Sequence, residues 1–320
     1  MVEEAAPDLD FDWARRFLQL RMVPSVETIS ADGLERVVWL ESVGRRPGSP
    51  RPVRLAVRHE VPRRRAATRP TAPPEGRLFV SSVPGLPAAT LRAAVIRMFD
   101  LDADVSAFLK LARRDRVLAP VVAANPRGLR QLQLLDPFEA LLRAILGQQV
   151  SVAAATTMTD RLVRLIATLG PRPRSGDVVP LLRPRYAFPR AGAIAELGPA
   201  RLRTIGLTRA KGAALHGAAT AVASGQLDLA SLRAASSDEA DRQLLALPGV
   251  GPWTAAYVRL RALGDRDAFP ATDLGLIRPL TALGVSPSGF HAAADRWRPW
   301  RGYATLHLWH SLGASVAVLA

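Results

Sequence analysis

The five residues Leu247-Pro248-Gly249-Val250-Gly251 constrain the fold of this chain more than any other segment. Apolar residues recur at helical spacing on both sides, and the segment between them is too short and too rich in glycine for anything but a tight turn. The sequence therefore predicts a helical hairpin at 247–252. Glycines allow close approach of a ligand to the backbone, and the helix starting near Pro252 directs its first amides outward, which suits a phosphate. A purely structural glycine turn is the alternative.

The charge of the chain favours a polyanionic partner. Lysine and arginine number 43 against 28 aspartates and glutamates, which gives a net charge of +15. A sequence pI near 11.5 at this size points first to nucleic acid. Lysine occurs only at Lys110 and Lys211. The alternative is an arginine excess that reflects codon usage and covers the surface without binding anything.

Several classes of protein are disfavoured by composition. The chain has no cysteine, which removes disulfides, thiol nucleophiles, iron–sulfur clusters and cysteine-ligated zinc. Of its five histidines only His307 and His310 lie close together, so a histidine-rich metal site is not expected. Because no apolar run reaches about 18 residues and the first ten residues are acidic, we expect no membrane span, no secretory export and a cytoplasmic protein.

The pattern of apolar residues changes near residue 87. Before it, 11–21 looks helical, and β-branched apolar runs at 37–41, 53–58 and 77–83 predict strands of an antiparallel sheet packed on that helix. The stretch 61–76, rich in proline and arginine, predicts an exposed loop.

After residue 87 the spacing is helical. The apolar residues of 137–149 fall on one face, Ser151 is a suitable cap for a helix ending at Gly170, and Thr208 for one closing at Gly225. A second proline- and arginine-rich connector covers 171–190. We expect an α+β chain that is mainly α, with a sheet domain at 1–86 and a helical domain at 87–320.

Six segments in order resemble the helix-hairpin-helix (HhH-GPD) DNA glycosylases, and within them the AlkA type, the DNA-3-methyladenine glycosylase II enzymes. They are FDWARRFLQLRMVPSVET, MFDLDAD, DPFEALLRAILGQQVSV, LPGVGPWTAAY, FPATD and RWRPWRGYATLHLWH. The resemblance spans nearly the whole chain. It implies an N-terminal antiparallel, TBP-like sheet domain followed by two helical lobes with a base-binding cleft between them.

The resemblance assigns catalysis to Asp273, which follows the hairpin in the FPATD segment. Cleavage of an N-glycosidic bond builds positive charge on the sugar, and a fixed carboxylate can stabilise it or orient the attacking water. A helix N-terminal role for Asp273, with Thr272 as the cap, is the non-catalytic alternative. Asp265 and Asp267 lie nearby but match no motif position.

Trp253, Tyr257, Trp309 and His310 match positions that line the base pocket of the family. From spacing alone, Trp253 and Tyr257 would be read as core residues. Electron-rich rings favour a cationic alkylated purine by roughly 0.5–2 kcal/mol through cation–π contact. The resemblance also places Gln149 where the family inserts a side chain into the gap left by the flipped base. Gln149, Leu274 and His310 depart from the residues of the best-known relatives.

DNA contacts are expected at Gly249, Gly251 and Thr254 through backbone amides, and at Gln148 and Gln149 in the turn after the helix of 137–149. Arg259 and Arg278 are candidates for further phosphate contacts, with solvated surface charge as the simpler interpretation. The resemblance further implies a structural Na⁺ or K⁺ bound by the backbone carbonyls of Leu245, Leu247 and Val250. No cofactor is expected for catalysis.

The sequence therefore predicts a monomeric bacterial enzyme, associated with the nucleoid, that flips alkylated purines out of double-stranded DNA and excises them by hydrolysis. Relatives that also cleave the strand carry a lysine after the hairpin glycine, where this chain has Pro252, so no lyase activity is expected. The alternatives are a glycosylase for deaminated bases such as hypoxanthine or uracil, and a non-catalytic DNA-binding module.

Overall fold

The computed structural model describes residues 1–6, 9–40, 51–61, 76–83, 85–124, 129–169 and 186–311. Five antiparallel strands form one sheet in the order β1-β5-β4-β3-β2. The strands are β1 (Val2–Ala6), β2 (Glu27–Ile29), β3 (Gly33–Leu40), β4 (Arg51–Glu60) and β5 (Gly76–Val83). The three predicted strands correspond to β3, β4 and β5. The two edge strands, β1 and β2, were not predicted.

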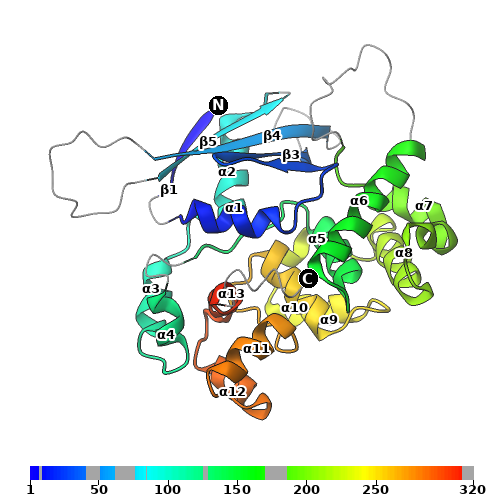
Figure 1. Cartoon of the computed structure of the whole chain (residues 1–320). Helices are drawn as coiled ribbons and strands as arrows, with labels where there is room; N and C mark the ends of the chain where they lie inside the picture. Colours follow the sequence, from blue (N-terminus) through cyan, green and yellow to red (C-terminus); the bar gives the residue numbers. More distant parts are fainter. Residues whose placement is uncertain are drawn as a thin grey trace.

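Helices make up the rest of the described chain (Figure 1). They are α1 (Phe11–Gln19), α2 (Ala88–Phe99), α3 (Val105–Ala112), α4 (Leu118–Ala123), α5 (Pro137–Gly147), α6 (Val152–Leu169), α7 (Ala191–Leu202), α8 (Arg209–Ala223), α9 (Ser237–Leu245), α10 (Pro252–Val258), α11 (Leu274–Ala282), α12 (Phe290–Asp295) and α13 (Arg301–Ser311). Short 3₁₀ turns are η1 (Arg203–Ile205), η2 (Ser231–Arg233) and η4 (Pro287–Gly289), and η3 (Arg259–Leu263) is a π-helical turn that continues α10.

Local sequence signals explain where several helices begin. Thr208 caps α8 by accepting a hydrogen bond from the amide of Lys211, and Ser151 accepts one from the amide of Ala154 at the start of α6. Pro252 occupies the first turn of α10, as the hairpin predicts. The fold class expected from the sequence is therefore confirmed. Most of the predicted loop at 61–76 and of the connector at 171–190 lies outside the described residues.

Two hydrophobic cores divide the molecule. One joins the sheet and α1 to α2, α3, α4 and the C-terminal helices α11 to α13, and it includes Phe17, Phe99, Phe108 and Trp309. The other lies among α5 to α10 and includes Phe138, Leu142 and Leu215. Tyr257 on α10 packs against both cores, so α10 marks the seam between the two lobes.

The sheet is tied to the second lobe by buried polar contacts. Arg36 on β3 donates to Glu139 on α5 at 2.7 Å, and the indole of Trp39 donates to the carbonyl oxygen of Phe188 at 2.7 Å. Figure 1 shows α1 between the sheet and the helical lobes. A side chain projecting from the end of α1 therefore reaches the seam.

Candidate active site

A cavity of about 1020 Å³ opens at the seam between the two lobes. Its walls come from the segment that follows α1, the turn between α5 and α6, the first turns of α6, α10, the start of α11, and α13. Among the lining residues are Asp273, Trp253, Tyr257, Trp309, Gln148 and Gln149. The fold thus brings most of the predicted site residues, which span 160 positions of sequence, into one cavity.

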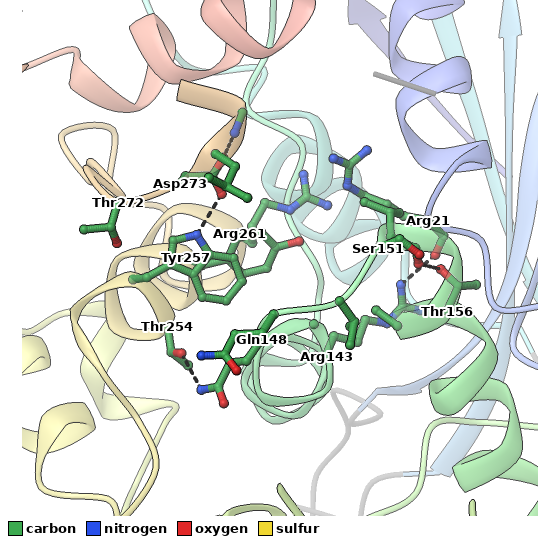
Figure 2. A pocket seen from close by; sticks show the side chains of 18 of the residues that line it. Arg21, Arg143, Gln148, Ser151, Thr156, Thr254, Tyr257, Arg261, Thr272 and Asp273 are labelled. Atoms are coloured by element: carbon green, nitrogen blue, oxygen red, sulfur yellow. Dashed lines mark hydrogen bonds between the residues drawn. The ribbon is translucent and has the colours of Figure 1, made fainter. Parts of the chain in front are cut away.

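Asp273 is fixed in the cavity wall by three N–H donors (Figure 2). The indole of Trp253 donates to Oδ2 at 2.7 Å, and the indole of Trp309 and the amide of Gly275 donate to Oδ1 at 3.1 and 2.8 Å. A carboxylate offers about four lone-pair directions, so three donors orient it and leave one direction open.

Asp273 also caps α11 through its bond from Gly275, so the cap is Asp273 itself and not Thr272. The same carboxyl group therefore caps a helix, as the non-catalytic alternative expects, and lies in the cavity wall. Asp273 serves the helix with one oxygen and still faces the cavity.

Aromatic rings form a continuous shelf beside Asp273. The rings of Trp253 and Tyr257 stack with centroids 5.3 Å apart, and Trp309 lies 6.5 Å from Tyr257. Phe17 on α1 stacks behind Trp309 at 6.3 Å. Both indole N–H groups are held by Asp273, so the polar edges of Trp253 and Trp309 are already engaged.

The hairpin packs tightly beneath its exposed turn. Gly249 has a φ of +81°, and a Cβ there would lie 2.6 Å from the Cβ of Ala214 on α8, so glycine is required at this position. Leu247 and Val250 are buried under the turn, while Gly249 is exposed and Gly251 half-buried. The two glycine positions thus lie at the surface, where the sequence places its DNA contacts.

Gln148 connects the hairpin to the end of α5. Its Nε2 donates to the carbonyl oxygen of Gly249 at 2.8 Å and to the hydroxyl of Thr254 at 2.9 Å, which uses both N–H groups of the amide. Thr254 is 1% exposed. Gln148 and Thr254 therefore help to hold the hairpin in place, and the DNA contact expected for them stays a prediction.

Gln149 follows in an exposed left-handed conformation with φ of +56°, which is uncommon for a residue other than glycine. It stands at the rim of the cavity, in the turn before α6. Backbone strain of this kind is concentrated at functional sites. The exposed side chain next to the cavity is compatible with insertion into DNA.

Two expectations need correction. His310 is absent from the cavity lining, and its ring lies edge-on to Trp13 on α1 at 6.4 Å. Arg259 is buried and paired with Asp241 and Asp265, both at 2.6 Å, so it is neither a phosphate contact nor a surface charge. Arg278 is exposed at the cavity rim, where it remains available.

The neighbouring acids are engaged in structure. Asp265 belongs to the Arg259 pair, and Asp267 pairs with Arg298 and Arg301. Neither lines the cavity that holds Asp273. Across the described ranges, no cluster of three or more His, Asp or Glu side chains is arranged to hold a metal ion. No helix in that part of the chain is both long and apolar enough to cross a bilayer.

Comparison with known proteins identifies the family. The profile of the HhH-GPD superfamily base excision DNA repair proteins matches residues 142–301, and that of the AlkA N-terminal domain matches 4–132. The chain belongs to the HhH-GPD superfamily. The residues that line the cavity fall within the matched ranges, apart from Leu134 and Trp309.

Two curated relatives and one solved structure show how far the similarity extends. DNA-3-methyladenine glycosylase 2 of Escherichia coli is 31% identical over 96% of this chain and 95% of its own length. The probable bifunctional transcriptional activator/DNA repair enzyme AlkA of Mycobacterium tuberculosis is 40% identical over 70% of this chain, which spans 43% of that protein. A 3-methyladenine DNA-glycosylase of Archaeoglobus fulgidus, 21% identical, matches 98% of both chains with a TM-score of 0.75.

Sequence reasoning missed the arginines of the cavity. Arg21 at the end of α1, Arg143 on α5 and Arg261 in η3 all line it (Figure 2). Arg143 is paired with Glu139 at 2.7 Å and with Glu27 at 3.0 Å, and these carboxylates hold its pKa above the usual value. Burial lowers the pKa of Arg21 and lowers that of Arg261 to about 10.

The signal for these arginines is weak in the sequence. Arg261 lies one turn beyond Tyr257, a spacing that places both on one face of a helix, but arginine at such a position usually indicates a solvated side chain. Arg21 reaches the cavity only because α1 packs behind Trp309.

Proposed function

We propose that this chain is a monofunctional DNA glycosylase that extrudes alkylated purines such as 3-methyladenine and 7-methylguanine from double-stranded DNA and hydrolyses their N-glycosidic bond. The observation that carries the proposal is the Asp273 carboxylate, oriented by three N–H donors beside an aromatic shelf. The relatives named for 3-methyladenine support the substrate class.

The geometry supports a dissociative hydrolysis. An extruded purine would stack on the Trp253–Tyr257 shelf with its sugar at Asp273. As the C1′–N bond breaks, the carboxylate stabilises positive charge at the anomeric carbon and accepts a hydrogen bond from the attacking water through its open lone pair. An alkylated purine departs as a neutral base, so the lesion itself lowers the barrier.

Hydrolysis without strand cleavage is consistent with the placement of the two lysines. Lys110 is exposed on α3, and the Nζ of Lys211 donates to the carbonyl oxygen of Leu146 at 3.0 Å. Neither lines the cavity. A Schiff base with C1′ needs a lysine amine at the reacting carbon, and none of the described lysines lies there.

DNA would dock on the hairpin and on the turn after α5. The exposed amides at Gly249 and Gly251 would meet phosphate, Gln149 would fill the gap left by the flipped base, and Arg278 would add a phosphate contact at the rim. We further propose action as a monomer on nucleoid DNA, with the sheet domain at 1–86 and the helical domain at 87–320.

A structural Na⁺ or K⁺ at the hairpin fits the open carbonyls there. Leu247 O accepts one hydrogen bond, from the amide of Val250 at 3.1 Å, and none of the described amides donates to the carbonyls of Leu245 or Val250. These oxygens, hard ligands of the type that such cations prefer, would bind the ion and stiffen the turn. Catalysis itself would need no cofactor.

The decisive test is Asp273→Asn, assayed for release of 3-methyladenine and 7-methylguanine from alkylated duplex DNA. Asparagine still caps a helix, so we expect a folded protein whose activity falls at least ~100-fold. Asp104→Asn is the matched control, because Asp104 caps α3 outside the cavity. Full activity of Asp273→Asn would refute the assigned role. Undetectable base release by the wild type, with salt-sensitive duplex binding retained, would favour the non-catalytic alternative.

A further inference from the structure

No contact described so far explains the burial of the Arg261 guanidinium in the cavity wall. Arg261 is 2% exposed, its Nε and Nη1 are buried without a hydrogen-bond partner, and no described carboxylate forms an ion pair with it. Its Cζ lies 4.7 Å from the centroid of the Phe17 ring, whose other arginine neighbour is Arg21 at 3.8 Å. A buried cation with free donors is costly unless something pairs with it.

The acids near the cavity do not balance this charge. Glu27 and Glu139 are matched by Arg36 and Arg143, at distances between 2.7 and 3.5 Å. This pairing leaves Arg21 and Arg261 facing a cavity whose one lining carboxylate, Asp273, is held at the other end by the two indoles. In Figure 2 the Arg261 and Arg21 side chains extend into the same region, beyond the Tyr257 hydroxyl.

Arg261 lies one helical turn after Tyr257, so it borders the far end of the aromatic shelf. With the sugar at Asp273 and the purine on the shelf, the edge of the base that points away from the sugar would meet this guanidinium. We propose that Arg261 is a specificity-determining residue that donates hydrogen bonds to the exocyclic oxygen of an extruded oxopurine. This inference rests on the proposed glycosylase function and refines it.

The positive charge of Arg261 should affect the release of neutral oxopurines and of cationic purines differently, because the two kinds of base leave with different charges. When C1′–N9 of a neutral oxopurine such as hypoxanthine breaks, the bonding pair goes to the base and its negative charge is shared with O6. Water then adds to C1′, and its proton ends on the departed base. A guanidinium at O6 stabilises the charge that develops on the leaving base. 3-Methyladenine is cationic, has no exocyclic oxygen and leaves neutral, so Arg261 offers it no comparable help.

The test compares two substrates on one variant. Arg261→Met should lower the single-turnover rate of hypoxanthine release about 10- to 100-fold, the usual effect of losing a hydrogen bond to a charged group. Release of 3-methyladenine should change less than about threefold, because the shelf and Asp273 stay in place. A partly unfolded variant lowers both rates alike, so the ratio of the two rates is the readout.

Two further variants complete the design. Arg278→Met removes an exposed arginine from the rim of the same cavity and should reduce both rates together through weaker DNA binding. Arg261→Lys keeps a charge but loses the planar fork, so it should retain part of the hypoxanthine activity, and it serves if Arg261→Met does not fold. Equal loss on both substrates, or unchanged hypoxanthine release, would overturn the inference. Failure of the wild type to release either base would instead overturn the proposed function.

Discussion

One methyl group added at Gly275 should disturb the geometry of the site while leaving all of its functional groups in place. A Cβ at residue 275 would lie 2.8 Å from Oδ1 of Asp273 and 2.9 Å from Cδ1 of Trp309. Both distances are about 0.5 Å inside ordinary van der Waals contact. The helix backbone at Gly275 is fixed by the cap, so Asp273 or Trp309 must move.

The magnitude follows from that displacement. A misplacement of about 1 Å at a reacting group costs roughly 100-fold in rate, so a shift of half that size should cost about tenfold, or about 1.4 kcal/mol in the barrier. Overpacking should also lower the free energy of unfolding by about 1–3 kcal/mol. We therefore expect Gly275→Ala to remain folded and to release 3-methyladenine about ten times more slowly in single-turnover assays.

Gly217→Ala is the matched control, because Gly217 lies in α8 and a Cβ there meets nothing within 4 Å. It should keep full activity and gain up to ~1 kcal/mol of stability from helix propensity. If Gly275→Ala releases the base as fast as the wild type, the contact of Asp273 and Trp309 does not set the catalytic geometry, and the reasoning fails.

Two further predictions concern the hairpin and the buried histidine. Gln148→Ala removes the hydrogen bonds to Gly249 and Thr254, so it should lower the free energy of unfolding by about 1–2 kcal/mol and weaken duplex binding. Gln149→Ala should leave the melting temperature unchanged. Equal melting temperatures for the two variants would contradict the positioning role of Gln148. Burial lowers the pKa of His307 to about 3, so between about pH 3 and 6.5 the unfolded state binds the extra proton and stability falls as the pH falls. In thermal unfolding measured across that pH range, the stability of His307→Gln should depend less steeply on pH than that of the wild type, by up to ~1.4 kcal/mol per pH unit. Parallel pH dependences of the wild type and the variant would contradict this prediction.

The sequence predicts the elements whose signal is local. Periodicity and caps place α5, α6 and α8, and the glycine turn places the hairpin, because each depends on residues within a few positions of each other. The edge strand β1 is different. Its five residues are mostly acidic or small. They form a strand because β5 offers a free edge, where Val80 to Gly76 pair with residues 70 to 78 positions earlier in the chain.

The residues of the site also divide into those with a local signal in the sequence and those without one. Motif matching finds Asp273, Trp253 and Tyr257, which lie within or shortly after the hairpin, and Trp309, which lies in its own C-terminal motif. Motif matching does not find Arg21, and it wrongly places Arg259 at the surface. Whether an arginine is exposed or buried in an ion pair depends on which carboxylates the fold brings to it. Asp241 and Asp265 bury Arg259, while Glu27 and Glu139 go to Arg143 and Arg36 and leave Arg261 unpaired. Such pairing is decided across separations of up to 116 residues.

The packing of Phe17 against Trp309 couples the N-terminal segment to the cavity. Phe17 on α1 stacks on Trp309 and Arg21 follows α1 directly, so the N-terminal segment supports one wall of the cavity and brings Arg21 to it. A shorter chain would have to rebuild that wall from another segment. Substitutions in α1 and in the turn at Arg261 should therefore alter the same cavity, although the two segments lie more than 200 residues apart in the sequence.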